Sequence, residues 1–277
     1  MTETIEQEIA RNRAVRAANI ERARRLSRRE GSALFRAARW AAVPLREGYA
    51  LWREHVRHAP ARRRVIADYL AGDGFKGLQV GCGPFRIEGW LNTDLMPRRM
   101  PWRAPDTCET TWDFPLDITA PLPFPDASLD AIFGEEVIEH VPREAALAFM
   151  AEARRVLRPD GVLRLTTPDI EGVCRLFLGE AEGADIETLE PYWLEGEWSP
   201  EHWINGQFRF WGHQFLWSGR QLTAALRDAG FARAERVTRG TTASRHERLA
   251  GVAGRTGPRD EAAAIARHTA LVVEGLT

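Results

Sequence analysis

Cysteines and long apolar runs are scarce in this 277-residue sequence, and each scarcity excludes a class of protein. The three cysteines are odd in number and form no CxxC pair, so we expect neither a disulfide framework nor a structural zinc site. No run of about 18 apolar residues is present, so no transmembrane helix is expected. The sequence starts Met-Thr-Glu-Thr without the apolar core of a signal peptide, which predicts a cytoplasmic protein.

Lysine is nearly absent as well: Lys76 is the only one, and arginine supplies the other basic residues. The formal net charge is −1, so the whole molecule carries no strong field. The charge is unevenly spread, because residues 1–64 hold 16 Arg against 7 Glu and the remainder is acidic. This asymmetry predicts an Arg-rich helical extension at 1–60, followed by an acidic domain at 61–277.

The extension contains two kinds of helical sequence. Residues 1–30 are polar with a weak apolar stripe, which is typical of a solvated helix. Residues 32–57 are more amphipathic and could pack on the domain, on a second subunit or on an anionic membrane surface. We favour packing. The sequence does not predict the oligomeric state.

From residue 61 onward, helical and strand patterns alternate. Helices are expected at 62–70, 143–157 and 218–229, with a further helix before the last strand. Strands are expected at 77–80, 90–95, 114–118, 129–133, 162–167, 232–237 and 269–274. Such alternation predicts an α/β fold with a doubly wound, mostly parallel sheet, in which ligands bind beyond the carboxyl ends of the strands.

Polar and glycine residues follow several of these strands. Gly81-Cys82-Gly83 comes after the first strand, where glycines permit a tight turn and a close approach of backbone to ligand. Asp94 ends the second strand and is placed to accept hydrogen bonds from ribose hydroxyls. A dinucleotide site is less favoured, because Arg86 occupies the position of the third glycine in G-x-G-x-x-G.

The motifs GCGP, LPFPDASLDAIF, EEVIEHV, RRVLRPDGVL and TTPD, in this order, resemble the type 11 class I S-adenosylmethionine (SAM)-dependent methyltransferases. The resemblance covers residues 64–175 and implies a Rossmann-like seven-stranded sheet with SAM as cofactor. It also implies that Gly81, Cys82 and Gly83 approach the methionine part of SAM and that Asp94 and Leu95 lie at the ribose. Asp117 and Ile118 would face the adenine, and Glu135 the methionine amine or the acceptor. The chain departs from the pattern at Gln79, where an acidic residue is common, and at Pro84, which replaces a glycine.

The run Glu136-Val137-Ile138-Glu139-His140 is a candidate metal or base site. If a helix starts at Glu135, Glu136 and His140 share a face and could hold Mg²⁺ or Mn²⁺ with Glu139. The run resembles the metal-binding segment of small-RNA 2′-O-methyltransferases, which implies His213 as a fourth ligand. Alternatively, His140 only orders the loop, or His140, His213 and Glu139 act as catalytic residues in deprotonating a hydroxyl.

The aromatic-rich segment 180–217 is expected to be an insertion on the acceptor side. Aromatic faces suit sugars, nucleobases or lipid chains, and the segment could also simply cover the sheet. Its sequence resembles type 11 members associated with polysaccharide and glycolipid assembly, which implies a sugar or lipid-linked sugar hydroxyl as acceptor. Two alternatives stay open: an RNA 2′-O-methyltransferase, with nucleic acid less favoured as a partner, and a non-catalytic interaction module.

Overall fold

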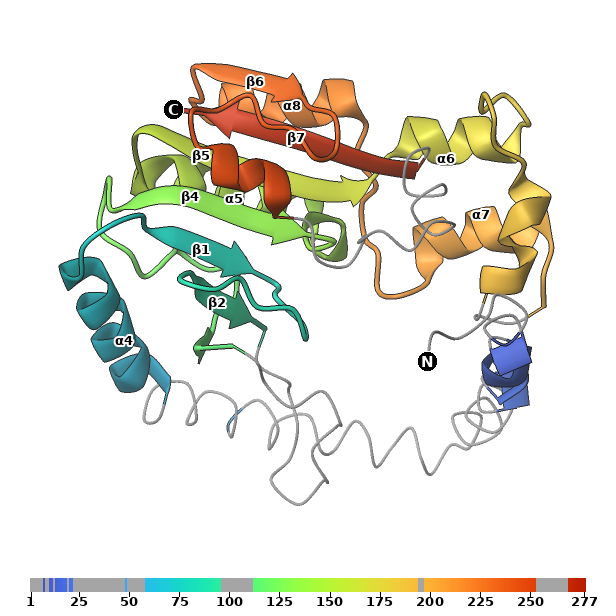
Figure 1. Cartoon of the computed structure of the whole chain (residues 1–277), viewed down its shortest axis with the longest axis horizontal. Helices are drawn as coiled ribbons and strands as arrows, with labels where there is room; N and C mark the ends of the chain where they lie inside the picture. Colours follow the sequence, from blue (N-terminus) through green and yellow to red (C-terminus); the bar gives the residue numbers. More distant parts are fainter. Residues whose placement is uncertain are drawn as a thin grey trace.

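The computed structural model describes residues 58–95, 112–193, 197–252 and 269–277, together with scattered positions between 7 and 48 (Figure 1). The described positions of the N-terminal extension are helical, residues 13–18 among them. Most of the amphipathic stretch expected at 32–57 lies outside the described residues. The same holds for most of the expected loop at 96–113 and for the helix expected before the last strand.

In the described part of the chain, seven strands form one sheet in the order β3-β2-β1-β4-β5-β7-β6. Strands β1 to β5 pair in parallel, and β7 runs antiparallel to both β5 and β6. The strands are β1 (Gly77–Val80), β2 (Leu91–Asp94), β3 (Phe114–Pro115), β4 (Leu129–Glu135), β5 (Leu157–Pro168), β6 (Arg233–Arg236) and β7 (Ala270–Leu276). The predicted doubly wound, mostly parallel Rossmann-like sheet is confirmed.

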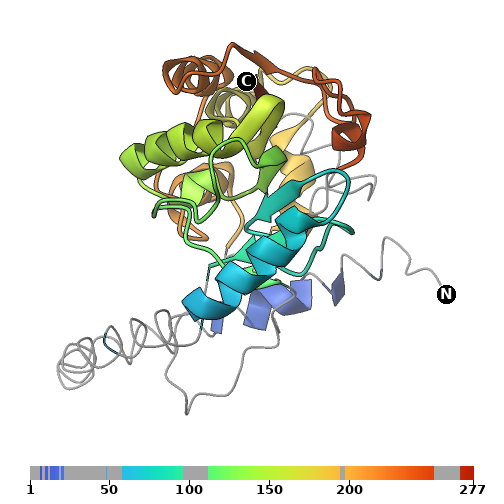
Figure 2. The ribbon, with the colours of Figure 1, turned by 90° about the vertical axis from the view of Figure 1, so that its left-hand side faces the viewer.

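Helices α5 (Arg143–Val156) and α8 (Gly219–Asp228) lie on one side of the sheet (Figure 2), and α4 (Ala59–Ala71) adds Ile66 to the core on that side. Helix α5 buries a stripe at helical spacing that includes Ala146, Phe149, Met150 and Ala153. This stripe and the inward side chains of the strands form one core. The opposite face packs against a short 3₁₀ helix, η4 (Glu247–Gly251), through a smaller cluster. Every helix in the described ranges is too short or too polar to cross a bilayer.

The only lysine of the chain, Lys76, binds the backbone carbonyls at the C-terminal end of α4. Lys76 is 4% exposed, and its ammonium donates to the carbonyl oxygens of Tyr69 and Gly72 at 2.7 and 2.5 Å. These carbonyls lie at the end of α4, where backbone acceptors have no partner within the helix and a cation is favourable. The lysine therefore connects the end of α4 to the start of β1.

A charged network fastens α5 to the turn before β4. Arg155 donates to the carbonyl oxygens of Leu122 and Phe124, both at 3.0 Å, and to the Asp126 carboxylate at 2.7 Å. Glu152, one turn earlier on α5, accepts from Arg155 and from the backbone amide of Leu122. These contacts hold the segment 122–126 against α5 and so set the start of β4.

The segment between β5 and α8 forms a second packing unit. Helix α6 (Ile170–Phe177), 3₁₀ helix η3 (Ile186–Tyr192) and α7 (Pro200–Arg209) share a core of their own that includes Trp193 and Trp203. The expected insertion at 180–217 supplies η3 and α7. A separate core of this kind places aromatic side chains beyond one end of the sheet.

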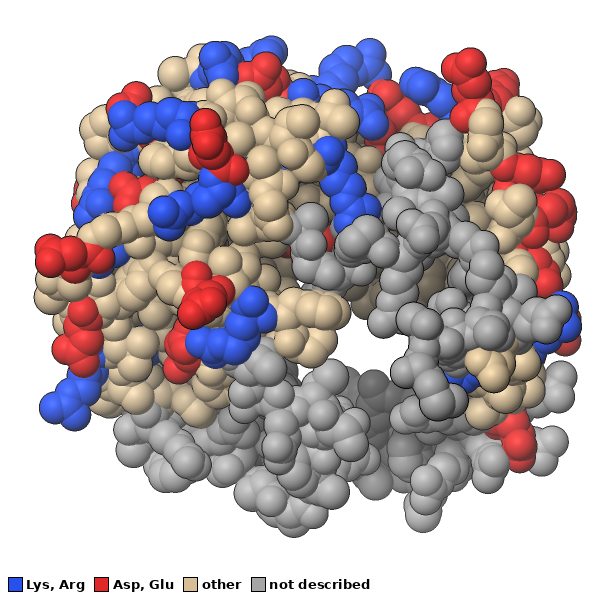
Figure 3. All heavy atoms as spheres, viewed as in Figure 1, with Lys and Arg blue, Asp and Glu red and all other residues tan. Residues whose placement is uncertain are grey.

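The basic extension meets an acidic part of this unit. Arg16 forms an ion pair with Glu190 at 2.9 Å and donates to the Glu190 carbonyl oxygen at 2.7 Å. Arg13 lies 3.9 Å from the same carboxylate. Figure 3 shows Asp and Glu side chains gathered over the same end of the molecule, to which residues 180–190 contribute. Opposite charges therefore bring the described part of the extension onto η3.

Candidate active site

The loop after β1 reverses the chain through two glycines. Gly81 and Gly83 have φ angles of 63° and 51°, in the left-handed region that glycine adopts without strain. A Cβ at position 81 would stand 2.2 Å from Val137 Cγ2, so only glycine fits there. Between them, Cys82 is buried and its amide donates to the Thr93 carbonyl at 2.9 Å, which fastens the loop to β2.

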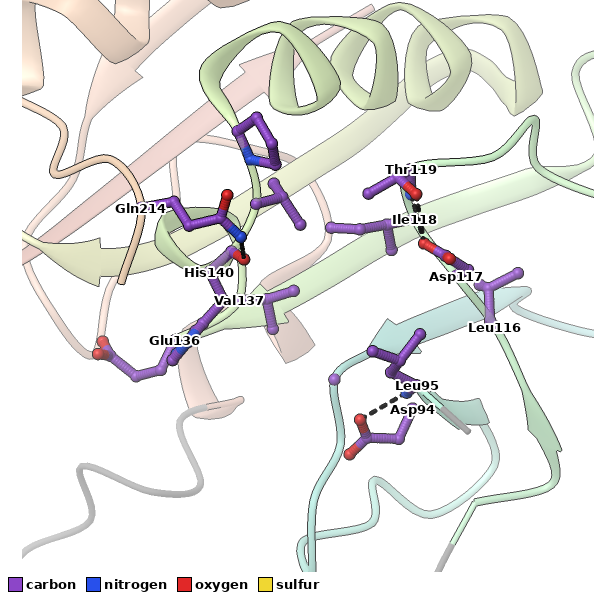
Figure 4. Close-up of a pocket in the computed structure, with 13 residues that line it drawn as sticks. Asp94, Leu95, Leu116, Asp117, Ile118, Thr119, Glu136, Val137, His140 and Gln214 are labelled. Atoms are coloured by element: carbon purple, nitrogen blue, oxygen red, sulfur yellow. Dashed lines mark hydrogen bonds between the residues drawn. The ribbon is translucent and has the colours of Figure 1, made fainter. Parts of the chain in front are cut away.

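Asp94, the last residue of β2, holds the same loop from the other side. Its Oδ2 accepts from the Gly83 amide at 2.7 Å, and its Oδ1 accepts from the Leu95 amide at 2.6 Å (Figure 4). Each carboxylate oxygen has a further lone pair, so the group can accept additional hydrogen bonds from a ligand. The arrangement fixes the carboxylate at the carboxyl end of β2, beside the loop that follows β1.

A cavity of about 500 Å³ opens beyond the carboxyl ends of β1, β2 and β4 (Figure 4). It is lined by Gly81, Asp94, Leu95, Leu116, Asp117, Ile118, Thr119, Glu136, Val137, His140, Val141, Pro142 and Gln214. Five of the predicted cofactor residues are in this wall, whereas Cys82, Gly83 and Glu135 are not. Glu135 is buried at the end of β4. The cavity and the predicted cofactor site therefore coincide in large part.

The wall of the cavity is acidic. Asp94, Asp117 and Glu136 contribute carboxylates, and no Arg or Lys is among the described residues that line it. Asp117 Oδ1 accepts from the amide and the hydroxyl of Thr119 at 2.9 and 2.7 Å, which orients this carboxylate. Such a wall favours a cationic or hydroxyl-bearing ligand over a phosphate.

Three titratable side chains meet at one edge of the cavity. Ligand atoms of Glu139, His140 and His213 all lie within 4.8 Å of one another, and His140 itself lines the cavity. Glu139 is fully buried; its Oε2 accepts from the Thr167 hydroxyl at 3.0 Å. Its Oε1 accepts no hydrogen bond from the described residues and lies 3.8 Å from His140 Nε2. A buried carboxylate oxygen without a donor favours a positive charge beside it.

His213 is oriented by a backbone carbonyl. Its Nδ1 lies 2.6 Å from the Gln207 carbonyl oxygen, which can only accept, so we assign the ring proton to Nδ1. Nε2 then carries the lone pair. The rings of His140 and His213 meet edge to face with centroids 4.9 Å apart. The two histidines therefore form a pair in which each limits the movement of the other.

The expected helix starting at Glu135 is wrong. Strand β4 continues through Glu135, Glu136 takes a left-handed φ of 54°, and only a short 3₁₀ turn, η2 (Ile138–His140), follows. The Glu136 amide donates to the Thr166 carbonyl of β5 at 2.8 Å, so the chain still follows the sheet there. Glu136 and His140 consequently do not share a helix face. Glu136 lines the cavity but lies outside the Glu139–His140–His213 group.

Backbone bonds bring two distant segments together at this group. The amides of Gln214 and Phe215 donate to the Glu139 carbonyl at 2.7 and 3.2 Å, and the Gln214 side chain donates to the His140 carbonyl at 2.6 Å (Figure 4). The sequence did not single out Gln214 or Thr167 as site residues. The one signal for Gln214 is its place next to His213; nothing in the sequence indicates that Thr167 binds Glu139.

Comparison with known proteins points to one class. Residues 109–165 match a family model described as a methyltransferase domain. A probable S-adenosylmethionine-dependent methyltransferase of Mycolicibacterium smegmatis is 48% identical over 50 residues, which is 18% of this chain. The matched part spans only 19% of that relative's length.

Solved structures with a similar fold include two proteins of this class. One is an S-adenosylmethionine-dependent methyltransferase of Mesorhizobium loti, with 15% identity and a TM-score of 0.42 over 78% of this chain and 98% of that chain. The other is a possible histamine N-methyltransferase of Thermotoga maritima, with 19% identity and a TM-score of 0.40 over 83% and 95%.

The family match and the curated relative support a class I SAM-dependent methyltransferase domain. The matched segment runs from just before β3 into β5 and contains the Arg155 network and the Glu139–His140 turn. The cavity at the strand ends is therefore a candidate active site of this class, with SAM as the expected cofactor.

Proposed function

We propose that the protein transfers a methyl group from SAM to a hydroxyl oxygen of a sugar or another small hydroxylated metabolite. The observation that carries the proposal is the His140–Glu139 pair at the edge of the cavity, since an alcohol must lose its proton to become a good nucleophile. The acidic wall has no Arg or Lys among its described residues, which argues against a phosphorylated or otherwise anionic acceptor.

The residues of the cavity fit SAM. The absent side chain at Gly81 lets the backbone approach the ligand, and the Asp94 carboxylate is placed for the ribose. Asp117 and Ile118 form the wall where the resemblance expects the adenine. The carboxylates of the wall suit a sulfonium cation. SAM held by these residues would share the cavity with His140, which lines the same wall.

SAM supplies an activated methyl group: the oxygen–carbon bond forms while the sulfur–carbon bond breaks, and that electron pair stays on sulfur in S-adenosylhomocysteine. His140 takes the proton of the acceptor hydroxyl on a ring nitrogen. The resulting imidazolium faces Glu139 Oε1, the buried oxygen that otherwise accepts no hydrogen bond from the described residues. Glu139 thus stabilises the protonated base, and His213 holds its ring in place. The proton leaves to solvent after the product departs.

A divalent cation is a second candidate at the same group, favoured by the unsatisfied Glu139 Oε1. Glu139 Oε1, His140 Nε2 and His213 Nε2 would hold it, because His213 Nδ1 is engaged by Gln207. Two imidazoles and one carboxylate suit Mn²⁺ better than Mg²⁺. When bound, such a cation would lower the pKa of a coordinated hydroxyl.

Thermal unfolding with S-adenosylhomocysteine tests the cofactor, with NAD as the control ligand. A ligand at 100 times its Kd adds about 2.7 kcal/mol, which corresponds to a rise of roughly 5 °C or more in Tm. No rise with S-adenosylhomocysteine would overturn the proposal and favour a non-catalytic module. A further rise with Mn²⁺ that is lost on adding chelator and absent in His213→Ala would support the cation.

Methyl transfer from labelled SAM tests the base. We expect His140→Gln to lower kcat by about 10²–10⁴-fold while the Tm shift with S-adenosylhomocysteine stays as in wild type. His246→Gln, on the opposite face beside Phe75, is the matched control and should keep full activity. Chelator-sensitive labelling of RNA rather than of sugars would favour the RNA 2′-O-methyltransferase instead. Against RNA, Arg13 and Arg16 of the basic extension pair with Glu190.

A further inference from the structure

The turn after α7 holds a large side chain in an unusual conformation. Trp211 has a φ of 56° and Gly212 a φ of 89°, so two consecutive residues lie in the left-handed region. This conformation is uncommon for a bulky residue, and strain of this kind clusters at functional sites. The turn therefore sets the direction in which the Trp211 side chain leaves the backbone.

Aromatic neighbours support the Trp211 ring on several sides. Its centroid lies 6.0 Å from that of Trp193 and 6.1 Å from that of Phe210, both in edge-to-face contact, and 5.5 Å from the ring of His213. Trp193 is buried, whereas Trp211 remains 49% exposed. The indole thus combines fixed support with a large accessible surface.

The His213 ring connects Trp211 to the proposed base. Its centroid lies 5.5 Å from that of Trp211 and 4.9 Å from that of His140. The backbone of Gly212 also approaches His140: a Cβ there would be 3.7 Å from Nδ1. A ligand on the indole could therefore place one of its groups at the edge of the SAM cavity.

The groups around this path favour one kind of ligand. An indole face covers apolar C–H surface with defined geometry, and the nearby Glu136, Gln214 and His140 offer polar partners. A pyranose ring has both an apolar face and hydroxyl groups at its rim. A phosphate-rich ligand would need cations, and the described cavity wall has none from Arg or Lys.

We propose that Trp211 is the acceptor-binding platform, on which a pyranose ring stacks so that one hydroxyl reaches His140. This inference rests on the proposed methyl transfer and names its acceptor class. It makes Trp211 a residue that determines specificity through contact with the acceptor, separate from the residues that bind SAM.

The test is saturation-transfer NMR with the methyl glycosides of mannose, galactose and rhamnose as probes, in the presence of saturating S-adenosylhomocysteine. Wild type should transfer saturation to the ring C–H protons of at least one glycoside. Trp211→Leu keeps apolar bulk without a ring and should weaken that glycoside's binding roughly tenfold. Trp211→Phe should recover most of the affinity, because it keeps a ring.

Phe208→Leu is the matched control, since Phe208 is another exposed aromatic of the same region at 40% exposure. It should leave glycoside binding unchanged. If wild type transfers saturation to none of the three glycosides, or if Trp211→Leu binds them as well as wild type does, the proposal that Trp211 is the acceptor-binding platform is wrong. All variants should keep the Tm rise with S-adenosylhomocysteine; failure of that rise in wild type would instead contradict the methyltransferase proposal.

Discussion

Glycine is required at position 81 for two reasons: the backbone is left-handed there, and a Cβ would collide with a neighbouring side chain. Two other glycines each show one of these reasons. Gly89 has a φ of 76° but open space around its missing Cβ. Gly77 has no left-handed φ, yet a Cβ there would collide with the Trp90 ring. Gly81 combines a left-handed φ with a wall formed by Val137, which also lines the cavity. A side chain there would therefore disturb both the turn and the site.

Gly81→Ala should lose S-adenosylhomocysteine binding and stability together. The left-handed φ costs roughly 1–2 kcal/mol for any other residue, and pushing Val137 aside adds about 1–3 kcal/mol. Gly89→Ala is the control, because it has the cost of the left-handed φ but no collision of the added Cβ. Titration calorimetry and urea unfolding measure both quantities. Equal ligand affinity in the two variants would show that the contact with Val137 does not matter for binding.

Several site residues could be predicted because each follows a strand in the sequence. Strand ends predict Gly81 and Asp94, whereas only the resemblance indicates Asp117; the parallel sheet brings all three to one edge. The contact between Glu139 and His213 joins residues 74 positions apart, so only the resemblance indicated it. Trp211 stood among many aromatic residues, and its left-handed φ cannot be read from its identity. The sequence also gave no reason to place Glu136 outside the cluster.

At the level of elements, charged side chains connect helices to the loops that precede strands. The segment Leu122–Asp126 and the end of α5 are far apart in the chain, and Arg155 joins them through two carbonyls and a carboxylate. The hydrogen bond from Arg155 is the main reason that the pKa of Glu152 is lowered, with the Leu122 amide as a further cause. Most strands were predictable to within a few residues, since their apolar runs are bounded by turns. Strand β5 is the exception, because it begins at Leu157 and includes residues 158–161, which the Pro-Asp-Gly sequence predicts as a turn.

Arg155→Ala should destabilise the protein by about 1.5–3 kcal/mol, the usual worth of hydrogen bonds to charged groups. Arg143→Ala, at the exposed start of α5, is the control and should have almost no effect. Urea unfolding at pH 7 measures both.

The same network predicts a pH dependence. The pKa of Glu152 is lower in the folded state than in the unfolded state. Its contribution to the free energy of unfolding is therefore complete above the unfolded pKa of about 4.3 and is lost as the pH falls through the folded pKa. Glu152→Gln should remove this part of the acid sensitivity. An unchanged acid transition in Glu152→Gln would show that other carboxylates control it.

Across the whole molecule, a buried ion pair joins parts of the chain that are far apart. Arg164 of β5 and Glu274 of β7 are almost completely buried and paired with each other. Arg164 also donates to the Thr241 carbonyl at 2.8 Å, while Glu274 accepts from the Thr242 hydroxyl and the Ala243 amide. The pair thereby connects two strands to the loop after β6.

Glu274→Leu should cost about 3–5 kcal/mol, because it leaves the Arg164 charge buried without its partner. Arg233→Leu breaks the exposed pair between Arg233 and Glu235, both in β6, and should cost less than about 1 kcal/mol. The double variant Arg164→Met with Glu274→Leu should be more stable than Glu274→Leu alone. If the double variant is less stable than Glu274→Leu alone, then side-chain packing rather than the unpaired charge determines the stability loss at this site.

The buried Lys76 makes the junction of α4 and β1 a single, selective target for a lysine-specific protease. Endoproteinase Lys-C has one possible cut in the whole sequence, and that bond lies where the ammonium is held by α4. Native protein should resist cleavage, and the rate at which two fragments appear should report how often this junction opens. One residue thus provides a built-in measure of local unfolding that needs neither a label nor a mutation.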